Sequence, residues 1–573
     1  MGIAEYQQQG SLKRPGRRGN NFLSMTGAGL SMLVALLVAV PILVVFGFVF
    51  VPAGDIWSHL ASTVLPVYLL NTLILFAGVS VLVVFIGVGT AWLVTMCEFP
   101  GRRLFSWAMF LPLAMPAYII AYTYTGMFDF AGPVQTFLRD LFDWTRQDYW
   151  FPPVRSVGGA VLMLGLVLYP YVYLVSRAAF LEQSICVLEV GRTLGRGPWG
   201  IFFHIALPLA RPAIVTGLAL ALMETLSDFG TVQYFAVDTF TTGIFRIWLG
   251  MGEPAAAAQL AAMLMGFVFL LVIVERLNRG ARKYHHTTGR YQGIRRFPLS
   301  GLRAGGAFLA CLLPVFLGFL LPSGWLLHES LRHPEAVLNL EFPALAFSSI
   351  SVAMVASLLT LVIAMGLVYG MRGGVSGRKN PVRTAAVRVS AMGYAIPGPV
   401  LAVGVMIPFG FLDNSVDAFM RSTFGISTGL LLSGTLVALI FAYMVRFLAV
   451  ALNTVEASVG KITPNMDRAA RTMGVTGLKA VIRVHIPIIS GSMMTALLLV
   501  FVDVMKELPA TLIMRPFGFE TLAVRAYELA SDERLSEAAG PSLAIVAAGI
   551  IPVIILSRAI ARSRPGQDGG AEG

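Results

Sequence analysis

The stretch that decides the fold is EVGRTLGRGPWGIFFHIALP, from Glu189 to Pro208, which recurs as RAARTMGVTGLKAVIRVHIP from Arg468 to Pro487. The two copies align without a gap, so that Gly195 falls on Gly474 at an offset of 279 residues (474 − 195). Each copy predicts a short polar helix, a break at the glycine, and a second helix that closes on the proline. Both copies are basic and lie between long apolar segments. We therefore expect both at the cytoplasmic face of a membrane protein.

The composition is that of an integral membrane protein. Of 573 residues, 57% are hydrophobic and 13% are charged, whereas about a quarter of the residues in soluble domains are charged. The net charge of +12 could indicate nucleic acid binding. However, the Lys and Arg residues gather in short loops beside apolar segments, where they orient a membrane protein in the lipid bilayer. This distribution argues against a nucleic acid partner. Cys97, Cys186 and Cys311 show no metal-ligand spacing, so no metal site is firmly assigned.

Twelve apolar segments predict transmembrane helices, six on each side of a basic linker. Helices are required because the bilayer core offers no water to backbone amides. In the first half the predicted spans are 28–52, 65–95, 104–127, 157–180, 211–235 and 255–275. In the second half they are 304–327, 344–371, 385–412, 426–450, 489–513 and 540–560. The sequence therefore predicts an all-α integral membrane protein.

The basic loops predict how these spans are oriented. With six spans per half, all seven basic segments fall on one side, which places both termini in the cytoplasm. Six is an even number, so both halves enter the membrane in the same direction. This predicts a parallel repeat with a pathway where the halves meet. The expected parts are a cytoplasmic N-terminal tail, a first half, a cytoplasmic linker, a second half and a C-terminal tail, over residues 1–27, 28–280, 281–303, 304–562 and 563–573.

The repeated stretch resembles the EAA signature of permease subunits of bacterial ABC importers. The residues of interest are Glu189, Arg192, Thr193, Gly195, Ile205 and Pro208 in the first copy, and Arg468, Ala469, Ala470, Arg471, Thr472, Gly474, Val484 and Pro487 in the second. Arg468 stands where the signature has Glu, and Val190 and Gly191 stand where it has two alanines. The resemblance implies a type I importer permease fold, and in each copy a coupling helix that docks on a separate ATPase.

No G-x-x-x-x-G-K-[ST] stretch occurs in the sequence, so we expect no nucleotide site on this chain. The resemblance then implies that two copies of an ABC ATPase subunit bind the chain and hydrolyse ATP. The chain itself is expected to be no enzyme and to bind no cofactor.

A second pattern lies in the span after each repeated stretch. Glu224 and Asp228 are four residues apart, as are their counterparts Asp503 and Glu507, and Lys506 lies beside the second pair. Residues four apart share a helix face. Acids within the membrane are costly and mark transport pathways or proton relays, and carboxylate oxygens suit hard cations. We predict that these five residues line the translocation pathway.

A structural role for the same acids is the alternative. Arg246, Arg525 or Lys506 could neutralise them, or they could cap broken helices near Gly230 and Pro509. Two runs of tyrosines could likewise line a pathway, although tyrosine at span ends is commonly interfacial. They are Tyr118, Tyr122 and Tyr124, and then Tyr169, Tyr171 and Tyr173.

The residues around the acids narrow the resemblance. METLSDFGTVQYFAVDTFTTGIFRIWLG, at 223–250, and DVMKELPATLIMRPFGFETLAVRAYELASDERLSEAA, at 503–539, resemble fused ferric-iron importer permeases. This implies a bacterial inner-membrane protein and an extracytoplasmic iron-binding protein that delivers Fe(III).

Other assignments stay open at this point. Related permeases carry thiamine, polyamines or oxyanions. A proton-coupled secondary transporter would take up its solute without any ATPase. A membrane-embedded enzyme lacks support, because no H-E-x-x-H motif or Ser/His/Asp set is present in the sequence.

Overall fold

The structure is a computed structural model. It describes residues 17–52, 55–182, 193, 195, 197–279, 296–335, 341–372, 381–460 and 462–562. Within these residues, eleven helices are long and apolar enough to cross a membrane, and a pair bent by 90°, Arg102–Ala114 and Ala117–Phe142, makes a twelfth if it is counted as one span. The predicted all-α membrane fold is confirmed. The strands described are β1 (Cys97–Glu98) and β2 (Phe297–Pro298), which pair in parallel.

The long helices follow one another in the same order in both halves. The first half contains α1 (Arg17–Gly47), α3 (Leu65–Met96), the bent pair, α7 (Val157–Glu182), the span Pro198–Ser227 with α10 (Leu207–Ser227), and α13 (Pro254–Arg279). The second contains the span Gly301–Arg332 with α14 (Gly301–Val315) and α15 (Leu321–Arg332), then α17 (Glu341–Arg372), α19 (Gly398–Phe424), α20 (Leu436–Val459), the span Leu478–Met505 with α23 (Ile486–Met505), and α26 (Leu535–Arg562).

Each half has a core of four helices packed in the same way. α7 packs on α3 and α10, and α20 packs on α17 and α23. α10 also packs on α13, as α23 packs on α26. Large apolar side chains such as Val81 and Phe85 of α3 are exposed, as lipid-facing residues are. This repeated core is the arrangement that the 279-residue repeat predicts.

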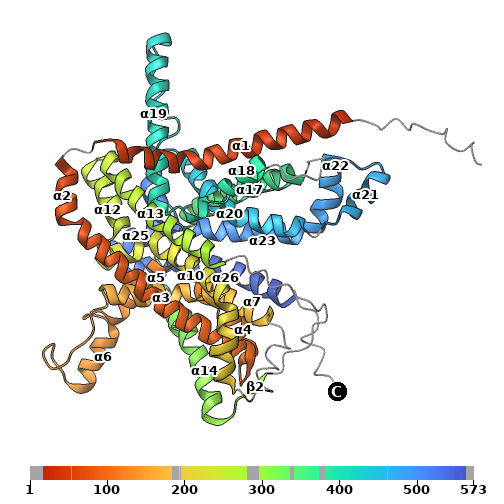
Figure 1. Cartoon of the computed structure of the whole chain (residues 1–573). Helices are drawn as coiled ribbons and strands as arrows, with labels where there is room; N and C mark the ends of the chain where they lie inside the picture. The colour runs from red at the N-terminus through yellow and green to blue at the C-terminus, as the bar shows by residue number, and fades with distance from the viewer. Residues whose placement is uncertain are drawn as a thin grey trace, which may run out of the picture.

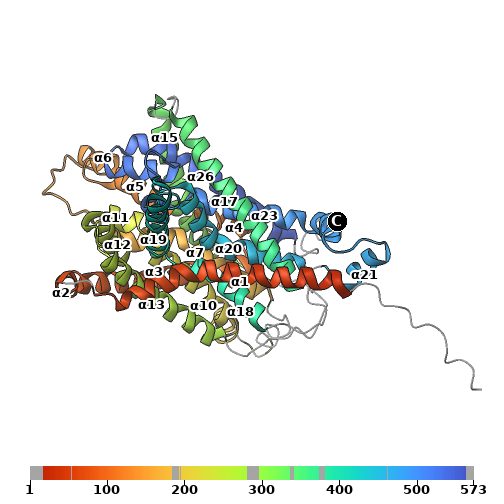
Figure 2. The ribbon, with the colours of Figure 1, turned by 90° about the horizontal axis from the view of Figure 1, so that it is seen from above.

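The first span of each half packs across the other half. α1 contacts α17, α19 and α18 (Pro381–Ser390) of the second half, whereas α14 contacts α3 and α4 (Arg102–Ala108) of the first. Figures 1 and 2 show α1 lying along the second-half helices. Each half therefore packs its first span against the other half, and the contact surface between the halves lies at the centre of the molecule.

The third span of each half is broken, where the sequence predicted one helix over 104–127 and one over 385–412. In the first half, α4 and the turn η2 (Leu111–Ala114) stop before Pro116, and α5 (Ala117–Phe128) follows. In the second, α18 and η6 (Gly393–Ala395) stop before Pro397, and α19 follows. Proline forces the residue before it out of the helical region: the ψ angles there are 112° and 120°.

The prediction that a helix closes on Pro208 and on Pro487 is wrong. Both prolines lie in the first turn of a helix, α10 and α23, that continues the span. In both copies a π-helical segment comes directly before that helix: η3 (Phe202–Ala206), which contains Ile205, and η7 (Val481–His485), which contains Val484. The wider π turn accommodates the missing proline N–H and the bulk of its ring, so the span continues through the proline.

Candidate functional site: an acidic cavity between the two halves

The second copy of the repeated stretch forms a short polar helix at one end of the molecule. α21 (Pro464–Thr472) carries the residues from Arg468 to Thr472, and Gly474 follows with a φ of +77°. In the first copy Glu189 and Arg192 lie outside the described residues, but Gly195 has a φ of +73°. Both glycines thus adopt the left-handed region, which favours glycine. Figures 1 and 2 show α21 at the opposite end from α12 (Phe240–Phe245) and α6 (Pro133–Phe142).

α21 is tied to the span that follows it. Asp467, in the first turn of α21, lies 2.8 Å from Nε2 of His485 in η7. The His485 ring stacks on Tyr369 of α17, with ring centroids 5.6 Å apart. Because η7 continues into α23, this contact joins α21 to the helix that carries Asp503.

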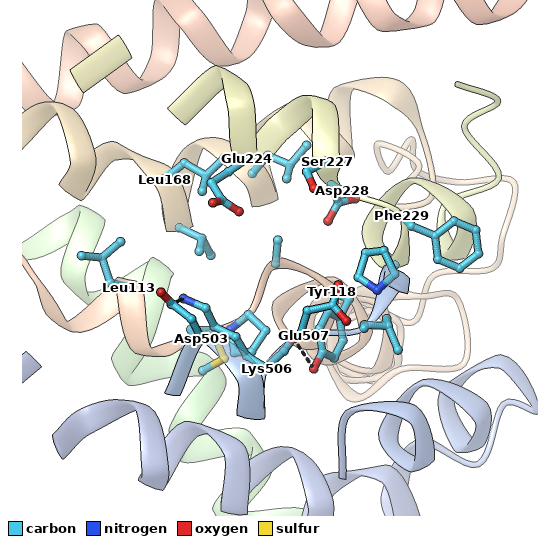
Figure 3. A pocket seen from close by; sticks show the side chains of 18 of the residues that line it. Leu113, Tyr118, Leu168, Glu224, Ser227, Asp228, Phe229, Asp503, Lys506 and Glu507 are labelled. Carbon is cyan, nitrogen blue, oxygen red and sulfur yellow. Dashed lines mark hydrogen bonds and ion pairs between the residues drawn. The ribbon is translucent and has the colours of Figure 1, made fainter. Parts of the chain in front are cut away.

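A cavity of about 110 Å³ lies between the two halves. The five predicted pathway residues, Glu224, Asp228, Asp503, Lys506 and Glu507, all line it. Figure 3 shows Glu224 and Asp228 on one side and Asp503, Lys506 and Glu507 across from them. The structure thus brings together in space two groups that are 279 residues apart in the chain.

The two pairs of acids do not share a helix face as predicted, because both helices end between their members. α10 ends at Ser227, and Asp228 has extended backbone angles. α23 ends at Met505, before Glu507. Asp228 accepts hydrogen bonds from the backbone N–H groups three and four residues ahead, both at 3.1 Å, and Glu507 does the same at 3.0 Å. Each carboxylate therefore caps the short helix after the break, α11 (Gly230–Tyr234) or α24 (Pro509–Met514).

The other member of each pair, Glu224 or Asp503, has a different environment. Glu224 accepts a hydrogen bond of 2.7 Å from the hydroxyl of Tyr394, which belongs to the second half. Asp503 forms an ion pair of 2.8 Å with Lys506. Neither carboxylate has a helix-capping bond among the contacts described, so both differ from Asp228 and Glu507, whose oxygens are held by the backbone.

The alternative of a structural role holds in part. Asp228 and Glu507 cap helices at the breaks, as that alternative proposed. Lys506 neutralises Asp503, as that alternative proposed. Arg246 instead pairs with Asp238 at 2.6 Å, and Arg525 lies 3.8 Å from Glu520. Neither arginine lines the cavity.

Arg446 of α20 is a cavity residue that the sequence analysis missed. Its guanidinium donates to Glu507 at 3.2 Å and to the Ser227 hydroxyl of the first half at 2.9 Å. The backbone N–H of Gly398 also donates to Ser227, at 3.2 Å. An arginine in the middle of an apolar span was the available signal, because such residues are rare unless they serve a site.

The charges of the cavity are unequal. Four carboxylates face two cations, Lys506 and Arg446, and both cations come from the second half. The first half contributes Glu224 and Asp228 without a cation. If all six groups are ionised, the lining carries an excess of negative charge in a low-dielectric setting, where charge interactions are strong. Among the described residues, no group of three or more His, Cys, Asp or Glu side chains is placed to hold a resident metal ion.

Comparison with known proteins gives consistent matches. Residues 83–283 match the family described as binding-protein-dependent transport system inner membrane component. The chain is 24% identical over 540 residues to the Fe(3+)-transport system permease protein FbpB 2 of Haemophilus influenzae, covering 92% of this chain and 97% of that protein. It is 30% identical over 207 residues to the molybdenum transport system permease protein ModB of Escherichia coli, covering 34% of this chain and 86% of that protein. The sulfate transport system permease protein CysT of Escherichia coli is 27% identical over 197 residues, 33% of this chain and 68% of that protein.

Proposed function

Because the chain belongs to the family of inner membrane components of binding-protein-dependent transport systems, we propose that it forms the translocation channel of an ATP-driven importer of ferric iron. The family membership and the membrane-spanning helices make it a multi-pass inner-membrane permease of the ABC importer class. Its relatives are permease components and not enzymes. The cargo, the partners and the coupling residues are the proposed part.

The charge of the cavity carries the proposal. Four carboxylates against two cations favour a cation over an oxyanion such as molybdate or sulfate, because an anion would add to the repulsion. Carboxylate oxygens are also the donors that hard cations prefer. The Fe(3+) permease FbpB 2 aligns with 92% of this chain. The molybdenum and sulfate permeases align with 34% and 33% of it.

For the energy source, we propose that two copies of an ABC ATPase bind the repeated stretches at the cytoplasmic face. Supporting this, α21 is a short helix at one end of the molecule, and the Asp467–His485 contact ties it to α23. When ATP closes the ATPase dimer, α21 and the first copy of the repeated stretch would move with it. The two halves would then rotate relative to each other around the cavity. On this account residues 28–280 and 304–562 are the two permease halves, both termini are cytoplasmic, and an extracytoplasmic iron-binding protein supplies the cargo.

Two other functions are separable by experiment. A thiamine or polyamine importer would also carry a cation through an acidic cavity. A proton-coupled secondary transporter would use the acids as a relay and would need no ATPase.

The test is uptake by the full chain together with its ATPase and binding protein in reconstituted vesicles. We expect ATP-dependent accumulation of ferric iron and no accumulation of molybdate, sulfate, thiamine or spermidine. Accumulation of another solute in place of iron would refute the ferric assignment. Uptake that persists after omission of the ATPase would refute the ABC mechanism.

A further inference from the structure

A row of tyrosines leads from the cavity along α5. Tyr118 lines the cavity, and its hydroxyl lies 3.5 Å from the backbone oxygen of Lys506; Figure 3 shows the side chain at the cavity's edge. Tyr122 follows one helical turn later, with ring centroids 5.7 Å apart. Tyr234 of α11 packs against Tyr122 in a T-shaped contact at 4.7 Å. These three rings form a continuous contact that starts at the cavity, and we name it the tyrosine row.

The tyrosine row ends at a charged cluster at the surface. The guanidinium of Arg155 lies 4.9 Å from the centre of the Tyr234 ring, and its Nη2 is 3.5 Å from the Tyr234 hydroxyl. The same Nη2 lies 3.9 Å from Asp129 of the first half and 3.6 Å from Glu533 of the second, and both carboxylates are more than half exposed. An arginine held between two exposed acids thus closes the outer end of the row.

The middle residue of the row has an unsatisfied polar group. The side chain of Tyr122 is 4% exposed, and its hydroxyl has no hydrogen-bond partner among the described residues. A buried hydroxyl without a partner costs about 1–3 kcal/mol. The Tyr122 oxygen is therefore free to bind a ligand without breaking an existing hydrogen bond among the described residues.

Two other tyrosines help to define the row. Tyr124 does not belong to it, because its hydroxyl donates to the backbone oxygen of Leu317 at 2.8 Å. Tyr169 of α7 is fully buried, and its hydroxyl also has no partner among the described residues. Neither residue lines the cavity.

We propose that the phenol oxygens of the tyrosine row form an outer binding station for a hard cation on its way to the cavity. The inference rests on the proposed function, which supplies the cation and the direction of travel. Phenol oxygens are hard donors that can accompany a hard cation through an otherwise apolar layer. Asp129 and Glu533 attract the cation at the mouth. Arg155 occupies the mouth until the cation replaces it between the two acids.

The first test is ferric uptake by the reconstituted complex with Tyr122→Phe, which removes the oxygen and keeps the ring. Tyr169→Phe is the matched control, since it removes a buried hydroxyl without a partner outside the row. We expect Tyr122→Phe to lower uptake by about tenfold at equal protein abundance. This is the lower end of the losses seen when a group that supports a metal site is removed, about 10- to 100-fold. Tyr169→Phe should stay within about twofold of the wild type. Equal uptake by the two variants would overturn the proposal.

The second test does not need iron transport. Terbium(III) is a hard cation whose emission is sensitised by nearby tyrosine, and it can be titrated into the purified full chain. We expect the tyrosine-sensitised emission to fall in Tyr122→Phe and to remain in Tyr169→Phe. Emission that is absent from the wild type, or equal in both variants, would overturn the station. Tyr122-dependent emission from a chain that takes up no ferric iron would instead support the station and refute the ferric cargo.

Discussion

At the residue scale, the four acids of the cavity separate into two roles. Asp228 and Glu507 satisfy the backbone at helix breaks, and Glu507 also holds Arg446. Glu224 and Asp503 make no such capping bond among the described residues. A carboxylate that fixes the backbone cannot leave its partners to follow a solute, so we assign the transport role to Glu224 and Asp503.

The first prediction at this scale concerns stability. Glu507→Gln leaves the buried Arg446 guanidinium without its counter-charge, which should cost about 3–5 kcal/mol in the free energy of unfolding. Glu520→Gln is the control: its contact with Arg525 is 3.8 Å long and partly exposed, so its loss should cost about 0–1 kcal/mol. Thermal unfolding of the purified chain measures both. Similar shifts for the two variants would show that Glu507 is not the anchor.

The sequence placed all five predicted pathway residues in one cavity but did not predict its geometry. The four acids were recognisable as a set, because each acid of the first half has a counterpart 279 residues later in the second half. The sequence offered breaks near Gly230 and Pro509 with capping acids only as an alternative, and it did not show which acid of each pair would cap: the hydrogen bonds of the fold separate Asp228 from Glu224. Arg446 was missed for another reason: its position in the repeat is occupied by Val167 (446 − 279), which also lines the cavity. Lys506 is likewise a charge of one half alone, but it was noticed because it lies beside Glu507 in the sequence, whereas Arg446 has no repeated acid beside it.

At the scale of elements, the sequence predicted the membrane-spanning helices but not the break in the third span of each half. A run of apolar residues indicates a helix, because lipid requires one. Pro116 and Pro208 look alike in such a run, yet Pro116 follows a break and precedes the first turn of α5, whereas Pro208 lies in a continuing span. The two prolines differ in what precedes them: a 3-10 turn before Pro116 and a π turn before Pro208.

The prediction at this scale tests the glycine after α21. Gly474 has a φ of +77° in open space, so alanine there should cost about 1 kcal/mol of backbone strain and shift α21. Gly518→Ala is the matched control, since Gly518 has a φ of +73° and equally open surroundings, away from the repeated stretch. We expect ATP-driven uptake to fall in Gly474→Ala and to persist in Gly518→Ala. Equal uptake at equal abundance would argue against α21 as the coupling element.

At the scale of the whole molecule, two similar halves form an asymmetric channel. The first span of each half packs on the other half, and hydrogen bonds from Tyr394 to Glu224 and from Arg446 to Ser227 cross the contact surface. A duplicated chain can place different residues at equivalent positions, and here both cations come from the second half. The sequence repeat indicates the pairing of the halves, whereas the exchange of first spans is a tertiary feature without a sequence motif.

The central claim is that this cavity carries a ferric cation past Glu224 and Asp503. The most direct measurement is ATP-driven ferric uptake by the reconstituted complex with Glu224→Gln and Asp503→Asn combined, with Glu520→Gln as the control outside the cavity. We predict that uptake is lost in the double variant and kept in the control, while both chains still bind the ATPase, because the substitutions remove the charges that balance the cargo. Wild-type uptake by the double variant at equal abundance would contradict the account.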